Sequence, residues 1–156
     1  MIDEACSICR MLIEERHPTD RQLAVLLDAA FGELVNRYGA EGRSPVHGDA
    51  RFLVAGLEGR AVGCGALQPT GDSSIGELKR MYVAPAFRGR GIGGAVLAGL
   101  EKLGADIGYL KIRLATGVRQ PEAIALYERR GYRLIEPYGK YVDDTLARCY
   151  QKTLAI

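Results

Sequence analysis

The sequence predicts a mixed α/β domain in which an antiparallel meander leads into a β-loop-α-β unit. Three strand-like runs, at 51–56, 61–67 and 76–83, follow one another with only short polar turns between them. A glycine-rich loop and a helical run then separate the third of these strands from another strand at 109–116. Two strands joined through a helix lie parallel and need a right-handed crossover, so we expect one parallel pair in the sheet.

Length and composition indicate one soluble domain over residues 1–156, with interspersed charges and a net charge of +2. The sequence has no basic stripe with interleaved aromatic residues, which argues against a nucleic-acid partner. No apolar run approaches the roughly 20 residues of a membrane span, so we expect no membrane association. The acidic N-terminus, Met1–Ala5, does not resemble a signal peptide, and we expect a cytoplasmic protein.

The four cysteines do not suggest a metal centre. Cys6 and Cys9 have the spacing of a metal knuckle, but no second pair accompanies them and the two histidines stand alone. We therefore expect no metal, and free thiols in a reducing compartment. Cys64, between two glycines of a strand, is expected to be a small core residue rather than a nucleophile.

The N-terminal part of the chain is expected to form a strand and a long helix. Residues 6–14 suggest the strand. Residues 19–22 have the form of a capping box, with Thr at the cap and Gln three positions later. Apolar residues behind the box recur at helical spacing, so the helix runs to about Tyr38, with Gly32 as a point where it could break. The glycine-bearing polar stretch at 39–49 is a loop.

The C-terminal part is expected to form two helices and two closing strands. The helix after the glycine loop ends near Gly108. Pro121 begins the next helix at the position that proline favours, and Gly131 ends it. Closing strands are expected at 132–136 and 147–153.

The strand at 76–83 alternates in character along its length. Strict alternation puts one set of side chains on one face of the sheet: Leu78, Arg80 and Tyr82. It puts the other set on the opposite face: Glu77, Lys79, Met81 and Val83.

The loop after this strand has the composition of a phosphate site. Four glycines within Gly89–Gly94 let the backbone approach a ligand closely and adopt positive φ. Successive N–H groups in such a loop, and the helix N-terminus behind it, attract an anion. Arg88 and Arg90 add two cationic, forked donors that match phosphate oxygens. A plain tight turn would need only one or two glycines.

The type of phosphate ligand is decided by context. Gly89, Gly91 and Gly94 match the dinucleotide-binding expression, but residues 85–88 separate them from the strand end. The acidic residue expected after the next strand is also missing, since that strand ends Leu114–Gly117. No Gly-Lys-Ser/Thr follows, which excludes a Walker loop. An NAD(P)-binding enzyme is therefore the disfavoured alternative.

Two motifs occur at a particular spacing on these elements. The first is V-x-P-x-x-R-G-x-G-x-G over residues 83–93, and the second is A-L-Y-E-x-x-G-Y over residues 125–132. Together they resemble the GNAT superfamily of acyl-CoA-dependent N-acyltransferases, across roughly residues 51–153. The resemblance implies a GNAT-like, mostly antiparallel sheet with a central splayed parallel strand pair, flanked by helices. It also implies that residues 1–156 form one N-acetyltransferase domain.

The resemblance implies acetyl-CoA as the co-substrate. Its pyrophosphate would lie on the loop residues Arg88, Gly89, Arg90, Gly91, Ile92, Gly93 and Gly94. The pantetheine arm would meet backbone groups of Met81, Tyr82 and Val83, where one N–H would face the thioester oxygen. Gln120 stands where relatives often have an asparagine that contacts the cofactor.

The resemblance also implies catalytic roles. Tyr127 matches the tyrosine that protonates the departing CoA sulfur in relatives; a residue of the helix's apolar face is the alternative. Glu77 lies on the strand from which many relatives supply a glutamate base, directly or through water. A solvated charge paired with Lys79 or Arg113 is the alternative for Glu77. Ala115 replaces an acid found in some close relatives, so no base is expected there.

The acceptor is expected to be a primary amine of a small molecule or an amino acid, attacked directly in a ternary complex. Tyr141 would line the acceptor site, and Arg37, Tyr38 and Arg43 could admit a carboxylate. The alternatives are a protein N-terminal or lysine acetyltransferase, and an acyl-CoA-binding sensor without catalysis. The C-terminal strands of relatives often make dimers, so a homodimer is a further expectation.

Overall fold

The computed structural model describes residues 10–39 and 45–154. The strands are β1 (Met11–Arg16), β2 (Arg51–Leu57), β3 (Arg60–Pro69), β4 (Ile75–Val83), β5 (Lys111–Gly117), β6 (Arg133–Ile135) and β7 (Ala147–Thr153). The helices are α2 (Arg21–Tyr38), α3 (Ile92–Ile107) and α4 (Pro121–Arg129), with the 3-10 turns η2 (Pro85–Phe87) and η3 (Gly139–Tyr141). One sheet has the order β1-β2-β3-β4-β5-β7-β6, in which only β4 and β5 pair in parallel. The predicted fold class is confirmed.

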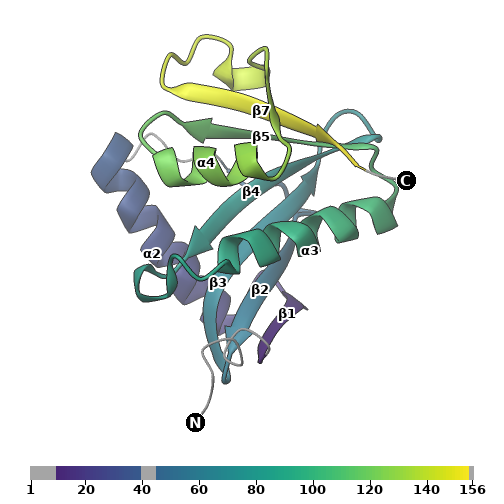
Figure 1. Cartoon of the computed structure of the whole chain (residues 1–156). Coiled ribbons are helices and arrows are strands. Elements are labelled where there is room, and N and C mark those ends of the chain that lie inside the picture. The colour runs from purple at the N-terminus through teal and green to yellow at the C-terminus, as the bar shows by residue number, and fades with distance from the viewer. Residues whose placement is uncertain (1–9, 40–44, 155–156) are drawn as a thin grey trace.

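The helices cover both faces of the sheet, with α3 and α4 on one face and α2 on the other (Figure 1). The larger apolar cluster lies under α3 and α4 and includes the fully buried Val96, Leu97 and Leu100. The smaller cluster lies under α2, around Leu23 and Leu26. The chain thus forms a three-layer α/β/α arrangement, as expected for a sheet that carries apolar residues on both faces.

The N-terminal part differs in detail from the sequence prediction. Among the described residues the first strand covers Met11–Arg16, two residues past the predicted end at residue 14, and residues 6–9 lie outside the described part of the chain. The N-cap of α2 is Asp20 rather than Thr19, because the Asp20 carboxylate accepts the Leu23 N–H at 3.0 Å. A carboxylate there also interacts favourably with the helix dipole. The helix continues through Gly32 without a break.

A bulge at Arg80 overturns the predicted alternation of β4. Ala66 pairs with Lys79 and Cys64 with Tyr82, so two β4 residues oppose a single residue of β3. Arg80 has a φ of 57°, in the left-handed region, and its carbonyl accepts the Cys64 thiol at 3.4 Å. The extra residue puts Leu78 and Met81 on the α3 face, while Tyr82 packs against the α2 cluster.

The parallel pair is short, and the two strands then diverge. Pairing covers Ile75–Glu77 of β4 with Lys111–Arg113 of β5 and stops there. Beyond Glu77, β4 remains paired with β3 on its other side, and β5 remains paired with β7. The backbone groups of Leu78–Val83 that face β5 therefore lack a strand partner. This is the splayed pair that the resemblance implied.

We expect Gly65→Ala to lower the free energy of unfolding by about 1–3 kcal/mol, as for other overpacked core sites. Gly65 faces the bulge, and a Cβ there would lie 2.5 Å from Met81 Sδ and 2.7 Å from Leu100 Cδ1. The control is Gly71→Ala, whose Cβ meets nothing within 4 Å. Denaturant unfolding measures both variants. Equal midpoints for the two would show that α3 does not pack tightly on the bulge.

Candidate active site

A cavity of about 490 Å³ lies where β4 and β5 separate. Lining residues come from both strands, from the C-terminal half of α2, from α4 with the residue before it, and from the 141–147 segment. Several residues predicted from the sequence line this cavity: Arg37, Tyr38, Met81, Tyr82, Gln120, Tyr127 and Tyr141. The structure thus brings residues from four separate segments of the chain to one site.

Other predicted residues lie outside the cavity lining. Glu77 is buried beside it, and Val83 with Arg88–Gly94 lie at the end of β4 and the start of α3. Arg43 falls outside the described residues. The glycine loop follows soon after the β4 residues that line the cavity, so a long ligand could contact both the cavity and the loop.

Tyr127 is placed by the way in which α4 ends. Gly131 N–H donates to Glu128 O at 3.2 Å and Tyr132 N–H donates to Tyr127 O at 3.0 Å, with Gly131 at a φ of 90°. These two bonds form a Schellman motif. The motif brings the Tyr132 ring edge-on to the Tyr127 ring, with centroids 5.8 Å apart. Tyr127 is 5% exposed. Burial raises the pKa of its phenol, so the hydroxyl stays protonated.

The glycine loop has the backbone geometry of an anion site. Gly89 and Gly91 both have a φ of 80°, and Gly91 is the N-cap of α3 without a side-chain cap. The first N–H groups of a helix have no acceptor within the helix. Those of Ile92, Gly93 and Gly94 are thus available to an anion at the positive end of the dipole.

The two loop arginines differ in their surroundings. Arg88 donates to Val83 O at 2.9 Å and to Glu33 Oε2 at 2.8 Å, so its guanidinium lies against α2. Arg90 lies over the Phe87 ring, with its guanidinium carbon 5.5 Å from the ring centroid. Arg88 therefore links the end of β4 to α2 in this structure.

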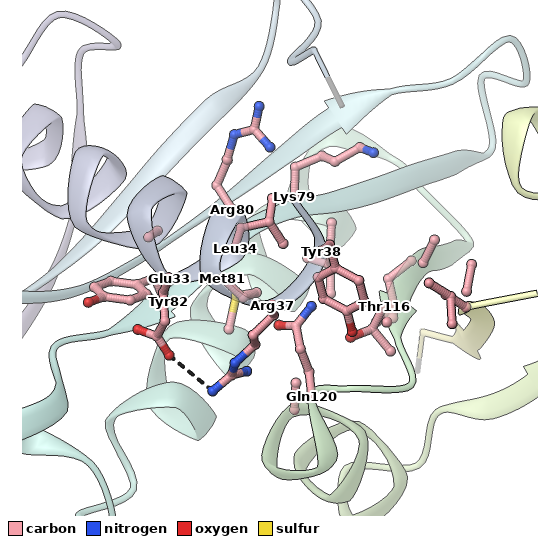
Figure 2. Close-up of a pocket in the computed structure, with 18 of the residues that line it drawn as sticks. Glu33, Leu34, Arg37, Tyr38, Lys79, Arg80, Met81, Tyr82, Thr116 and Gln120 are labelled. Carbon is pink, nitrogen blue, oxygen red and sulfur yellow. Dashed lines mark hydrogen bonds and ion pairs between the residues drawn. The ribbon is translucent and has the colours of Figure 1, made fainter. Parts of the chain in front are cut away.

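Glu33 is a site residue that the sequence analysis missed. It lines the cavity and also accepts from Arg37 at 3.2 Å (Figure 2). The neighbouring Arg88 guanidinium lowers the pKa of Glu33, so its carboxylate is ionised. The spacing of Glu33 and Arg37 signals an ion pair on one helix turn, whereas nothing local in the sequence signals the contact with Arg88.

Hydrogen bonds of Tyr38 and Arg119 link α2 to the segment between β5 and α4. Tyr38 Oη accepts the Arg119 backbone N–H at 2.8 Å, and the Arg119 guanidinium donates to Arg37 O at 2.7 Å. The Tyr38 ring lies directly on Gly117, where a Cβ would collide with the hydroxyl. The Tyr38 hydroxyl is therefore engaged in holding α2 to the segment between β5 and α4.

Glu77 belongs to a buried polar network beside the cavity. Its carboxylate accepts from Tyr138 Oη at 2.7 Å and from Gln68 Nε2 at 3.3 Å, and it lies 3.7 Å from Lys79 Nζ. Lys79 in turn lines the cavity and donates to Tyr141 Oη at 2.8 Å. The network lies at the base of the splay, on residues that pair β4 with β3 and β5.

The arrangement fits acetyl-CoA. An open strand edge can satisfy the amides of a pantetheine arm, as an added strand would. The glycine loop at the end of that edge offers N–H groups to a pyrophosphate, and the cavity places a neutral phenol beside the same edge. Within the described residues, no group of three or more His, Cys, Asp or Glu side chains could hold a metal ion.

Comparison with known proteins agrees with this geometry. The acetyltransferase (GNAT) family profile matches residues 16–132. The chain belongs to the GNAT acetyltransferase family. An IAA acetyltransferase from Azospirillum brasilense is 37% identical over 143 residues, which cover 92% of this chain and 88% of the relative. By family, the chain is therefore an acetyl-CoA-dependent acyltransferase.

Solved structures of this family share the fold. A structure from Klebsiella pneumoniae, described as an acyl-CoA N-acyltransferase, is 31% identical to this chain and superimposes with a TM-score of 0.81. The match covers 93% of this chain and 98% of that one. A GNAT family acetyltransferase from Elizabethkingia anophelis, solved with acetyl-CoA bound, has a TM-score of 0.71 at 20% identity, over 93% of this chain and 99% of that one.

The GNAT chain has no membrane-type helix and no accessible thiol in its described part. Neither α2, α3 nor α4 combines the length and apolar character needed to cross a bilayer. Cys64 and Cys149 are both buried, and burial raises the pKa of the Cys64 thiol to about 12. Cys6 and Cys9 lie outside the described residues.

Proposed function

We propose that this GNAT protein transfers an acetyl group from acetyl-CoA to a primary amine of a small molecule or amino acid, by direct attack in a ternary complex. The observation that carries the proposal is one cavity that is lined both by the open edge of β4 and by the neutral Tyr127. The glycine loop follows that edge directly along the chain. A thioester held along β4 would therefore have an acid at its sulfur.

The cofactor would extend from the loop into the cavity. Backbone N–H groups of Gly89–Gly94 and the Arg90 side chain would hold the pyrophosphate, with Arg88 in support. Backbone groups of Met81, Tyr82 and Val83 would pair with the pantetheine arm, and one N–H there would stabilise the tetrahedral oxyanion. Gln120, which lines the cavity, would add a polar contact.

The acyl group would pass directly from sulfur to nitrogen. The neutral amine attacks the thioester carbon, the tetrahedral intermediate collapses, and the C–S bond breaks as Tyr127 donates a proton to the sulfur. A covalent acyl-enzyme would need a thiolate, and the raised pKa of Cys64 and Cys149 disfavours one. Glu77 would receive the amine proton through water, since it lies behind the cavity lining.

The cavity favours a small acceptor. Helix α2 forms one wall of the cavity, and the contact of Tyr38 with Arg119 holds that wall against the segment between β5 and α4. Arg37, Tyr38 and Tyr141 would then form walls of the acceptor site. A protein lysine or N-terminus would have to enter a cavity of about 490 Å³ with α2 held as one wall, which makes protein acetylation the less favoured alternative. An acyl-CoA sensor without catalysis would not need the buried phenol of Tyr127.

Release of free CoA thiol tests the proposal. We expect acetyl-CoA to be consumed only when a suitable primary amine is added, with one acetylated amine formed per thiol released. The panel should contain amino acids, polyamines, arylalkylamines and a lysine peptide, with an amine-free reaction as control. Acetyl-CoA binding without turnover of any amine would instead support the sensor alternative. Absence of acetyl-CoA binding would contradict both.

A further inference from the structure

The cavity contains a cationic side chain, Lys79, to which the proposed acetyl transfer assigns no role. The Lys79 side chain lines the cavity but is only 12% exposed. Its Nζ donates to Tyr141 Oη at 2.8 Å, and Tyr141 lines the same end of the cavity. The Lys79 and Arg80 side chains extend from β4 away from the Glu33–Arg37 pair (Figure 2). That pair contacts the loop residue Arg88 through Glu33.

Lys79 has donor capacity left over. An ammonium group has three N–H donors, and one of them goes to Tyr141. The nearest carboxylate oxygen, Glu77 Oε2, is 3.7 Å away, which is too long for a hydrogen bond. That oxygen already accepts from Tyr138 at 2.7 Å. A group entering the cavity could therefore receive a charge-assisted hydrogen bond from Lys79.

The cavity lining carries charged side chains of both signs. The side chains that line it include three cations and two anions: Arg37, Lys79, Arg80, Glu33 and Asp144. Glu33 is shared with Arg88 outside the cavity, and Asp144 Oδ1 accepts the Leu146 N–H at 2.9 Å. Behind the lining, Glu77 lies 3.7 Å from Lys79 Nζ and so faces the ammonium from one side only. A carboxylate on the cavity side could hydrogen-bond to the same ammonium directly, and such charge-assisted bonds are the stronger kind.

The position of Lys79 suits an acceptor rather than the cofactor. Lys79 precedes Met81 on β4, whereas the phosphate loop follows Val83 at the other end of the strand. A ligand group on Lys79 would lie beyond the thioester, on the side from which the amine must come. The amine and the group on Lys79 would then belong to the same small molecule.

We propose that Lys79, held by Tyr141, binds a carboxylate of the acceptor, so that the acceptor is an amine that also carries a carboxylate. This inference rests on the proposed acetyl transfer and specifies its substrate class. Besides its proposed role as base, Glu77 would then also orient the Lys79 ammonium, which lies 3.7 Å from its carboxylate. Tyr138 and Gln68 hold that carboxylate in place.

Matched pairs of free L-amino acids and their carboxamides test the inference. A carboxamide lowers the pKa of the adjacent α-amine, so at neutral pH the intrinsic reactivity favours the amide. We expect the wild-type protein to reverse this order, with kcat/KM for the free acid about 10-fold or more above that for the amide. For Lys79→Met we expect the acid-to-amide ratio to fall by about 10- to 100-fold, the range for a lost hydrogen bond to a charged group.

Two further variants separate binding from folding. Lys79→Arg keeps a cation and should retain a ratio above one, even if Lys79→Met is unstable. Lys140→Met removes a neighbouring lysine that does not line the cavity, and should leave the ratio unchanged. Calorimetry with acetyl-CoA should give the same affinity for all of these variants.

Three results would overturn the inference. The first is a wild-type preference for amides, and the second is an equal loss for both members of each pair in Lys79→Met. The third is the absence of turnover with every free amino acid while acetyl-CoA binds and other amines are acetylated, which leaves the proposed acetyl transfer intact. Failure of acetyl-CoA to bind at all would overturn the proposed function, and the inference with it.

Discussion

Tyr127→Phe is expected to lower kcat about 100-fold while the affinity for acetyl-CoA stays nearly unchanged. The substitution removes only the hydroxyl, so the packing of the buried ring against Tyr132 remains. Burial keeps the phenol neutral, and its pKa lies above that of a thiol, about 8.5. Donation of the Tyr127 proton to the departing sulfur therefore has little driving force, which favours the lower end of the general-acid range.

The pH profile distinguishes this role from others. Because the pKa of Tyr127 is raised above its usual value of about 10, the residue does not titrate at lower pH. The variant should thus keep the wild-type shape of kcat against pH below about pH 10, at a lower level. Tyr132→Phe is the control, since Tyr132 Oη donates to Glu101 at 2.9 Å and does not line the cavity. Equal kcat in the two variants would make Tyr127 a packing residue.

Replacement of both loop arginines should weaken acetyl-CoA binding about 100- to 10,000-fold, because each loses charge-assisted contacts worth about 1.5–3 kcal/mol. Arg88→Ala also leaves Glu33 without one of its two cations, and this carboxylate would then repel the pyrophosphate. Arg90→Ala removes a cation that stacks on Phe87. Calorimetry with acetyl-CoA measures the single variants and the double variant.

Arg51→Ala is the charge control for this experiment. Arg51 bonds to Glu15 on the far strands β1 and β2, so its loss changes the net charge but not the loop. Its affinity for acetyl-CoA should match that of the wild type within about twofold, and the loss in the loop variants should shrink as ionic strength rises. Wild-type affinity in the double variant would show that the pyrophosphate binds elsewhere.

Local sequence signals identified most of the elements correctly. Pro121 begins α4 and Gly131 follows its end, because a proline ring and a glycine in positive φ act on the residues beside them. Gly89 and Gly91 adopt the positive φ that the glycine-rich loop suggested. The fold class followed from the order of strands and helices, and the family followed from two motifs at a characteristic spacing.

The bulge in β4 could not be predicted in this way. Arg80 is not a residue type that favours a φ of 57°. Its conformation is stabilised by pairing with β3 on both sides of the bulge, and by the Cys64 thiol on its carbonyl. A one-residue insertion reverses the faces of all later side chains, so the alternation argument failed from that point onward.

Motifs and element order were enough to identify the family, the glycine-rich loop and the position of Tyr127 on the helix that follows β5. Which side chains share the cavity became clear only from the packing of distant segments. Glu33 meets Arg88 across 55 positions of the chain, and Lys79 meets Tyr141 across 62. Glycine and proline signals act through the backbone of adjacent residues. Ion pairs between distant segments depend instead on how α2 and the segment around η3 pack on the splayed strands.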